Sequence, residues 1–247
     1  MKRDWVGKTY WLVGASEGLG RALAQLLSEA GAHLVLSARN EDTLKALADD
    51  LPGRATVLPM DVTDPASVAQ AAQALGRIDG LIFLAGVYWP MKATEWDADK
   101  AAQMIEVNVN GAIRSVGAVL PQMLARGGGH IVLTGSLSAY RGLPGAIGYG
   151  ASKAAIMSLA ESMHCDLHNS GIEVQLANPG FIRTRLTDKN DFKMPFLMEP
   201  DEAARHMFRH LSGDAFAGDF PWLFSTVFRL SRLLPEGLYI RLFGARD

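Results

Sequence analysis

The chain has 247 residues, of which 49% are hydrophobic and 20% charged, and its formal net charge is −2. This length is enough for one large domain or two small ones, and the composition is that of a soluble globular protein rather than a disordered chain. So small a net charge offers no strong field to a nucleic acid, and we therefore expect no nucleic-acid partner.

Cysteine, histidine and targeting signals narrow the class further. Cys165 is the only cysteine, which excludes an intrachain disulfide and a cysteine zinc site. His164 and His168 stand four positions apart on a predicted helix; a helix surface or subunit contact is favoured over a metal pair, because no third ligand is recognisable nearby, and no metal is expected. The start of the chain lacks a signal peptide, and no apolar run reaches the ~18 residues that span a bilayer, so a cytoplasmic protein is expected.

Short β-rich runs alternate with helical patterns through most of the sequence. Continuous apolar runs predict strands covered on both faces, at residues 9–13, 33–38, 55–60, 80–85, 130–135 and 173–178. Helical patterns lie between them, at residues 22–30, 41–51, from 65 onward, 97–125 and 150–169. Thr63 or Asp64 could cap the third helix, with Pro65 in its first turn. This order predicts an α/β protein with a single Rossmann-like, doubly wound parallel sheet and helices on both faces.

Beyond residue 180 the alternation fades. Residues 181–200 show no clear period and predict a long loop, which in a compact domain is usually a functional lid or disordered. A helix is predicted at 200–211, followed by an apolar, aromatic tail in which no strand is evident. We expect one domain over residues 1–247, with a cofactor-binding and catalytic core at 7–184 and a substrate lid and apolar C-terminal extension at 185–247.

The first predicted strand ends in "GASEGLG", which leads straight into the first predicted helix. Glycines let the backbone turn sharply and approach a ligand closely, and the helix amides beyond them can hold a pyrophosphate. Gly14, Gly18 and Gly20 could serve a tight turn alone, but their place at the first strand-to-helix junction favours a nucleotide site.

A tyrosine and a lysine stand four positions apart in "GYGASKAA", which places Tyr149 and Lys153 one turn apart on one helix face. Such a pair arises often by chance and alone marks only the start of a helix. Ser136 precedes the tyrosine by 13 residues, and Asn108 lies upstream in "VNVNG". Alone, Ser136 would be a strand-end turn residue and Asn108 a cap or kink residue.

Several motifs occur in the order typical of one enzyme family. They are "GASEGLG", "MDV" at 60–62, "AG" at 85–86, "VNVNG", "TGSLS", "YGASK" and "NPGFIRT". With this order and its G-x-x-x-G-x-G spacing, the chain resembles the short-chain dehydrogenase/reductase family over about residues 7–184.

The resemblance makes a reacting set of four residues, because their joint spacing is that of the family: Asn108, Ser136, Tyr149 and Lys153. It also implies a role for each. Tyr149 would be the general acid in reduction and the base in oxidation, and Lys153, as an ammonium, would lower the pKa of the tyrosine and hold the nicotinamide ribose. Ser136 would hydrogen-bond the substrate carbonyl, and Asn108 would help hold a water that connects the site to bulk solvent.

The resemblance also implies a nicotinamide cofactor and the residues that contact it. Asp61 and Val62 would border the adenosine, and residues 179–184 the nicotinamide and pyrophosphate. The full implied set is Gly14, Ser16, Glu17, Gly18, Leu19, Gly20, Arg39, Asn40, Asp61, Val62, Ala85, Gly86, Tyr149, Lys153, Pro179, Gly180, Ile182 and Thr184.

Two positions bear on which cofactor is used and how. Arg39 follows the second predicted strand, where NAD-specific members typically carry an acidic residue; an arginine can pair with a 2′-phosphate, so NADP is predicted over NAD. Glu17 opposes this, because its charge would repel the phosphate. Phe83 and Leu84 replace two asparagines usual in the family, which predicts a drier, repacked strand end.

The substrate side and the tail are apolar. Segments 87–91 and 137–145 and the loop after Thr184 predict a hydrophobic carbonyl or alcohol substrate. In residues 220–243 a helical pattern shows an apolar face with two arginines set aside. The face comprises Leu223, Phe224, Val227, Phe228 and Ser231, and the arginines are Arg229 and Arg232. Core or subunit interface is the favoured interpretation, with a membrane-surface contact or substrate lid as the alternative.

These features together predict an NAD(P)-dependent oxidoreductase that interconverts a carbonyl and an alcohol by hydride transfer, with NADPH-dependent reduction favoured. The alternative is a catalytically weak nucleotide-binding or membrane-associated protein on the same fold. An epimerase or dehydratase is disfavoured, because the chain lacks a sizeable C-terminal substrate domain. The helices that carry Asn108 and Tyr149 pair between subunits in many members of the family, so a homodimer or homotetramer is expected.

Overall fold

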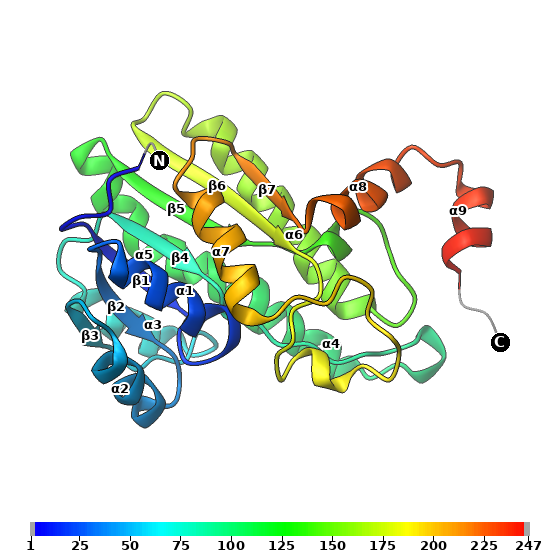
Figure 1. The fold of residues 1–247 in the computed structure, drawn as a ribbon, viewed down its shortest axis with the longest axis horizontal. Coiled ribbons are helices and arrows are strands. Elements are labelled where there is room, and N and C mark those ends of the chain that lie inside the picture. The colour runs from blue at the N-terminus through cyan, green and yellow to red at the C-terminus, as the bar shows by residue number, and fades with distance from the viewer. Residues whose placement is uncertain (1–2, 245–247) are drawn as a thin grey trace.

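A computed structural model describes residues 3–244, which form a seven-stranded sheet flanked by helices (Figure 1). Every neighbouring pair of strands is parallel, and the order is β3-β2-β1-β4-β5-β6-β7. The strands are β1 (Thr9–Val13), β2 (His33–Ser37), β3 (Ala55–Val57), β4 (Gly80–Phe83), β5 (Gly129–Thr134), β6 (Ile172–Pro179) and β7 (Ala217–Phe220). The predicted fold class, a doubly wound parallel α/β sheet, is confirmed.

The helices largely follow the predicted pattern. They are α1 (Gly18–Glu29), α2 (Glu41–Asp50), α3 (Pro65–Ala74), α4 (Ala98–Ile105), α5 (Gly111–Arg126), α6 (Ile147–Asp166), α7 (Pro200–Leu211), α8 (Trp222–Ser231) and α9 (Glu236–Phe243). Asp64 caps α3 by accepting a hydrogen bond from the Ala66 amide, with Pro65 in the first turn. The single helix predicted at 97–125 is divided into α4 and α5 by a π-helical turn, Glu106–Asn110.

Alternation along the strands builds two cores, one on each face of the sheet. On one face Leu12 and Leu36 pack with α1, α2 and α7. On the other face Trp11, Val35 and Leu81 pack with α3, α5 and α6. Burial on both faces explains why the strands read as continuous apolar runs.

β7 is a strand that the sequence did not predict. Its four residues pair with the end of β6, from Leu176 opposite Ala217 to Pro179 opposite Phe220. A short edge strand with a glycine and an aspartate carries no hydrophobic alternation, so its pattern alone does not identify it.

The face predicted for the tail helix is wrong in part. In α8 the buried residues are Phe224, Ser225, Phe228 and Ser231, whereas Leu223 and Val227 are 56% and 47% exposed. Phe224 and Phe228 pack against Leu137 at the carboxyl end of the sheet. α9 stands apart from the sheet (Figure 1), and no helix among residues 3–244 is both long and apolar enough to cross a membrane.

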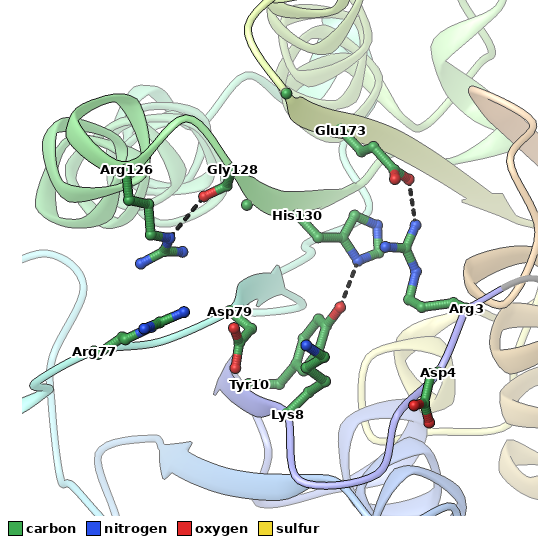
Figure 2. Close-up of a pocket in the computed structure, with 12 residues that line it drawn as sticks. Arg3, Asp4, Lys8, Tyr10, Arg77, Asp79, Arg126, Gly128, His130 and Glu173 are labelled. Atoms are coloured by element: carbon green, nitrogen blue, oxygen red, sulfur yellow. Dashed lines mark hydrogen bonds and ion pairs between the residues drawn. The ribbon is translucent and has the colours of Figure 1, made fainter.

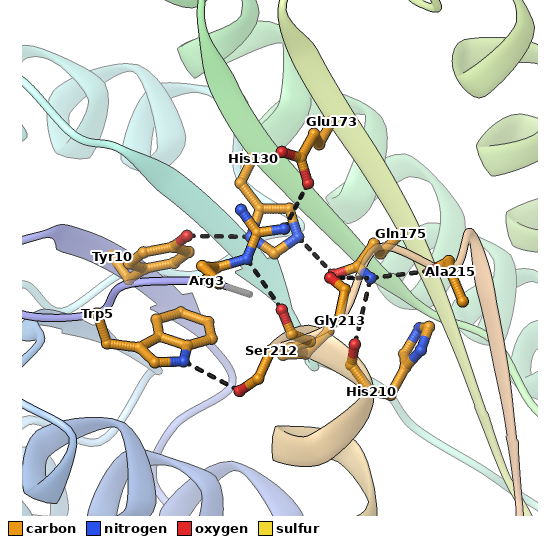
Figure 3. Close-up of polar contacts among 11 residues, drawn as sticks. Arg3, Trp5, Tyr10, His130, Glu173, Gln175, His210, Ser212, Gly213 and Ala215 are labelled. Atoms are coloured by element: carbon orange, nitrogen blue, oxygen red, sulfur yellow. Dashed lines mark hydrogen bonds and ion pairs between the residues drawn. The ribbon is translucent and has the colours of Figure 1, made fainter. Parts of the chain in front are cut away.

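A buried histidine links three strands at the amino end of the sheet (Figure 3). The side-chain amide of Gln175 donates to the Ala215 carbonyl at 2.8 Å, so its oxygen faces His130 Nε2, also at 2.8 Å. Nε2 must therefore carry the ring proton, and Nδ1 accepts from the Tyr10 hydroxyl at 3.0 Å. In this arrangement both ring nitrogens of the neutral imidazole are satisfied.

The chain before β1 is held to the same region. The Trp5 indole N–H donates to Ser212 Oγ at 3.0 Å, and Arg3 Nε donates to the Leu211 carbonyl at 2.9 Å (Figure 3). Arg3 also forms an ion pair with Glu173 of β6. These contacts fix the amino-terminal segment against the end of α7 and place a cation beside His130.

The neutral histidine predicts acid sensitivity of the fold. Burial holds the pKa of His130 well below its usual value of 6.5, and Arg3 and His210 add positive charge that lowers it further. Below about pH 6.5 the His130 imidazole is protonated in the unfolded chain but stays neutral in the folded protein. The contribution of this group to the free energy of unfolding is therefore full above about pH 6.5 and is lost as the pH falls. We expect the free energy of unfolding to fall by about 1.4 kcal/mol per pH unit from this group below that pH.

Urea unfolding of wild type, His130→Gln and His168→Gln, between about pH 7 and about pH 5.5, measures this contribution. His130→Gln is expected to be less stable but to have a shallower pH slope, by about one proton. His168, exposed in the turn after α6, serves as the control and should keep the wild-type slope. An unchanged slope in His130→Gln would show that this histidine is not the acid-sensitive group.

Candidate active site

A large cleft lies at the carboxyl ends of the strands. Its volume is about 1340 Å³, and it is lined by the turns after β1, β4, β5 and β6, by the segment that follows residue 182 and by α8. β1 and β4 are neighbours in the sheet, but the chain leaves β1 toward β2 and leaves β4 toward β5. Ligands of open α/β sheets bind at such a switch point.

The glycine-rich turn brings the amino end of α1 to this cleft. Glu17 precedes the helix, and its side chain forms no capping hydrogen bond. By contrast, Asn40 and Asp64 cap α2 and α3 with their side chains. The first amides of α1 therefore have no side-chain oxygen to bind, which suits them to an anionic ligand such as a pyrophosphate.

Glycine is required in this turn for close backbone approach. Gly14 has φ +95°, and a Cβ there would lie 2.5 Å from the Ala85 amide nitrogen. A Cβ on Gly20 would lie 2.1 Å from the Gly14 carbonyl oxygen. The turn from β1 into α1 and its contact with the end of β4 thus exclude any larger side chain at both positions.

Ser136, Tyr149 and Lys153 line the same cleft. Tyr149 and Lys153 are one turn apart in α6, with the lysine Nζ 5.6 Å from the centroid of the tyrosine ring. Ser136 follows β5, and its side chain acts on the Tyr149 phenol by lowering the pKa of that group. The ring of Tyr88, from the segment after β4, stands edge-on to Tyr149 with centroids 5.0 Å apart.

Burial dominates the ionisation of both reacting groups. It raises the pKa of Tyr149 to about 12, although the hydrogen bond with Ser136 opposes the rise. It lowers the pKa of Lys153 to about 8. Lys153 is not among the causes that act on the pKa of Tyr149, and its ammonium donates to the Thr134 carbonyl at 2.8 Å. A phenol with so high a pKa is protonated at neutral pH and is a proton donor.

The groups around Lys153 fit a bound nucleotide. The ammonium has three N–H donors and makes one protein hydrogen bond, which leaves two for a ligand. The Thr134 hydroxyl is buried in the cleft wall without a hydrogen-bond partner in the part of the chain described. Buried polar groups are normally paired, so these unused donors and acceptors suit the ribose hydroxyls and amide of a nicotinamide nucleotide.

Asn108 lies behind the cleft wall and does not line it. It is fully buried in the π-helical turn, where Oδ1 accepts from the Val87 amide at 2.8 Å. Nδ2 donates to the Val87 carbonyl at 3.1 Å and to Ser152 Oγ at 2.9 Å. Because Ser152 Oγ donates to the Tyr149 carbonyl at 2.8 Å, this amide joins the segment after β4 to the helix of the tyrosine. Both N–H groups of its side chain are used, so only Oδ1 or the main chain is left for the predicted contact with a water.

The apolar replacements at the end of β4 are accommodated by packing. Phe83 is buried in the core and approaches Gly111 of α5, where a Cβ would lie 3.4 Å from the ring. The Leu84 and Ala85 amides both donate to the Val13 carbonyl, at 2.7 and 2.9 Å. The strand end keeps its backbone connection to β1 without the two asparagines.

The surroundings of two charged residues, Arg39 and Glu17, bear on the predicted choice of cofactor. Arg39 is exposed at the rim, and within residues 3–244 its guanidinium forms no hydrogen bond or ion pair. Glu17, whose charge counted against NADP, forms an ion pair with Arg185 at 2.9 Å. Arg185 follows the lid entry at Thr184 and was not singled out from the sequence, because nothing in the local pattern marks so distant a partner.

The cleft gathers all of the predicted cofactor residues except Asn40. They are Gly14, Ser16, Glu17, Gly18, Leu19, Gly20, Arg39, Asp61, Val62, Ala85, Gly86, Tyr149, Lys153, Pro179, Gly180, Ile182 and Thr184. Asn40 instead caps α2 by accepting from the Thr43 amide at 3.0 Å. One carboxylate oxygen of Asp61 accepts from the amide and hydroxyl of Thr63, a local turn that the sequence did not reveal.

Residues 185–192, the segment predicted to be a lid, and α8 complete the cleft. Lys189 donates to the Tyr88 carbonyl at 2.7 Å and lies over the Trp89 ring at 4.5 Å, and the Tyr88 hydroxyl donates to Asn190 at 2.9 Å. These contacts hold the lid against the segment after β4. Phe224 and Phe228 form part of the wall, so the tail helix contributes to the cleft.

A second pocket lies at the opposite, amino end of the strands (Figure 2). It has a volume of about 650 Å³ and is lined by charged side chains, with Arg126 Nε donating to the Gly128 carbonyl at 2.7 Å. None of the predicted site residues lines it. Elsewhere His164 stacks on Phe216 with centroids 4.4 Å apart, and residues 3–244 contain no group of three or more potential metal ligands.

Comparisons with known proteins agree with this geometry. The sequence matches the family model for short chain dehydrogenases over residues 8–194. It is 37% identical to an uncharacterised oxidoreductase of Myxococcus xanthus over 240 residues, 94% of each chain. The protein therefore belongs to the short-chain dehydrogenase/reductase family and is an oxidoreductase of that type.

Solved structures of the family share the fold. A short-chain dehydrogenase from Sphingobium yanoikuyae in complex with NADPH matches with a TM-score of 0.82 at 28% identity, over 97% of this chain and 96% of that one. A short chain dehydrogenase from Burkholderia cenocepacia in complex with NADP matches with a TM-score of 0.87 at 24% identity, over 99% of this chain and 100% of that one. The use of a nicotinamide cofactor is thus supported by family and fold.

Two glycine-to-alanine changes test the glycine-rich turn. Gly20→Ala places a Cβ against the Gly14 carbonyl oxygen, which should cost about 1–3 kcal/mol of stability and weaken binding of NADPH. Gly117→Ala, also inside a helix, meets open space and should be neutral or stabilising by up to ~1 kcal/mol. Thermal unfolding and titration of NADPH fluorescence measure both effects. Wild-type NADPH affinity in Gly20→Ala would contradict the assigned role of the turn.

Proposed function

We propose that this protein is an NADPH-dependent reductase of hydrophobic ketones or aldehydes. One observation carries the proposal: Ser136, Tyr149 and Lys153 line the same cleft as the uncapped amino end of α1. A protonated phenol, an ammonium with unused donors and a nucleotide loop are the parts that hydride transfer to a carbonyl requires.

Different residues of the cleft would bind the cofactor, orient the substrate and transfer the proton. The glycine-rich turn would hold the pyrophosphate, and Lys153 and Thr134 the nicotinamide end of the cofactor. The bound cofactor supplies the hydride that reduces the carbonyl carbon. Tyr149 would donate its proton to the carbonyl oxygen, and the Ser136 hydroxyl would hydrogen-bond the same oxygen and hold it in place. Asn108 would act only through position, by joining Val87 to the helix that carries Tyr149.

Apolar walls support a hydrophobic substrate. The residues that close this end of the cleft are Tyr88, Trp89, Leu143, Phe192, Phe224 and Phe228. Phe224 packs against Gly180, where a Cβ would lie 3.2 Å from its ring, so the wall stands directly beside the predicted nicotinamide segment. Few charged groups approach Tyr149 from this side, and desolvation is the main cause of its raised pKa.

NADP is the proposed cofactor in preference to NAD. Arg39 is free at the rim, and Arg185 offsets the charge of Glu17 that would otherwise repel a phosphate. Two solved relatives hold NADP or NADPH, which supports the same choice.

We also propose a homodimer or homotetramer. Ile113 and Leu124 are both 50% exposed on α5, the helix that follows the turn of Asn108. An exposed apolar helix face of this kind is typical of an interface between copies.

Tyr149→Phe tests the proton donor. Removing the hydroxyl should lower kcat at least ~100-fold, because general acid catalysis typically contributes that much or more, while NADPH binding stays nearly unchanged. Oxidation of NADPH against a panel of ketones and aldehydes measures the first effect, and NADPH fluorescence measures the second. Tyr239→Phe, which changes a tyrosine of α9 outside the cleft, is the control and should retain kcat. Substantial turnover by Tyr149→Phe would exclude the assignment.

Arg39→Ala tests the cofactor preference. Loss of a charge-assisted hydrogen bond to a 2′-phosphate should raise the KM for NADPH by roughly 10-fold or more. NADH lacks that phosphate and serves as the internal control, so its KM should hardly change. An equal rise in the KM for NADPH and for NADH would show that Arg39 does not bind the 2′-phosphate.

A further inference from the structure

The outer side of the α8–α9 segment is unusually apolar. Its exposed large hydrophobic residues range from 44% exposed at Leu238 to 80% at Leu233. We call them the tail surface: Trp222, Leu223, Val227, Leu230, Leu233, Leu238, Ile240 and Leu242. So many exposed apolar residues within one short segment mark an interaction site rather than ordinary surface.

The tail surface is built on a fixed support. Phe224 and Phe228 anchor α8 from its inner side against Leu137. Arg141, from the loop after β5, donates to the carbonyls of Ser231 and Leu234 and so holds the turn between the two helices.

α9 is held by the same arginine. The guanidinium of Arg141 lies over the Tyr239 ring at 3.9 Å, and the Tyr239 hydroxyl donates to the Gly142 carbonyl. These contacts fix the Tyr239 side of α9, so that Leu238 and Leu242 lie on one flank of the helix and Ile240 on the other.

Charge distinguishes between the occupants that could cover this surface. Residues 222–244 contain Arg229, Arg232 and Arg241 but only one acidic residue, Glu236, a local charge of 3 − 1 = +2 in a chain whose net charge is −2. Arg229 is partly offset by Asp219 at 3.5 Å, whereas Arg232 and Arg241 are exposed and unpaired within residues 3–244. A symmetric contact with a second copy would bring these like charges together, whereas an anionic surface would attract them.

We infer that the tail surface docks the protein on an anionic lipid bilayer. Bulky apolar residues beside arginines, with a tryptophan at one end, are the composition of a helix that lies in the membrane interface. The apolar side chains would enter the boundary between head groups and acyl chains, and Arg232 and Arg241 would remain at the level of anionic head groups. The contact is peripheral, because none of the described helices can span a bilayer.

The position of the docked surface bears on the substrate, and this step alone rests on the proposed function. The inner side of α8 lines the cleft through Phe224 and Phe228, while its outer side carries the tail surface. The cleft wall would then stand one helix away from the lipid, so an apolar carbonyl compound dissolved in the membrane would reach the cleft by a short path.

Vesicle flotation tests the docking without using activity. The full chain is mixed with vesicles of phosphatidylcholine alone or of phosphatidylcholine with phosphatidylserine, at low and high salt. We expect the protein to float with the phosphatidylserine vesicles, with at least ~10-fold weaker binding to the neutral ones, and to dissociate as salt increases. Failure to float with anionic vesicles at low salt would overturn the proposal, whatever the enzyme assay shows.

Matched variants distinguish vesicle binding through the tail surface from nonspecific adsorption of the protein. Leu230→Glu combined with Leu233→Glu changes two exposed side chains and should abolish flotation without altering thermal unfolding. Val6→Glu, at a residue 70% exposed near the other end of the sheet, should float as wild type does. Flotation by the double variant, or its loss in Val6→Glu, would contradict the proposal. So would light scattering that shows a wild-type oligomer dissociated by the double variant without any vesicle binding, since the tail surface would then join copies of the chain.

Discussion

The turn from β1 into α1 is the constraint on which the cleft depends. Gly20 lies so close to the Gly14 carbonyl, and Gly14 so close to the Ala85 amide, that neither position has room for a side chain. This approach places the uncapped end of α1 at the switch point between β1 and β4. Because the strands are parallel, the same edge of the sheet also carries the ends of β5 and β6, so the glycine-rich turn lines one cleft with Ser136, Tyr149 and Lys153.

A second constraint fixes the tyrosine relative to that edge. The buried amide of Asn108 bonds both backbone groups of Val87 and the hydroxyl of Ser152, which in turn bonds the carbonyl of Tyr149. The segment after β4 and the start of α6 thus behave as one unit. Asn108 therefore positions Tyr149 through these hydrogen bonds. The π-helical turn at Glu106–Asn110 holds the Asn108 side chain in the interior.

The sequence predicts the fold well where packing dictates composition. Strands buried on both faces must be continuously apolar, and such runs located six of the seven strands. β7 was not predicted, because its pairing with β6 makes it a strand and its own sequence carries no hydrophobic pattern. The inner face of α8 was misassigned because helical period identifies an apolar stripe but not the neighbour it meets. The partner of Glu17 could not be inferred, since Arg185 lies far along the chain and only the fold brings the lid over the glycine-rich turn.

Burial determines the ionisation of Tyr149 and Lys153. Burial penalises charge on both groups, so it raises the pKa of Tyr149 to about 12 and lowers that of Lys153 to about 8. At neutral pH the pair is therefore a neutral phenol beside an ammonium, which can give a proton to a carbonyl oxygen at once. The cost of charging these two groups and the position of Arg39 at the rim both arise at the same edge of the sheet, where the strands end and the cleft opens.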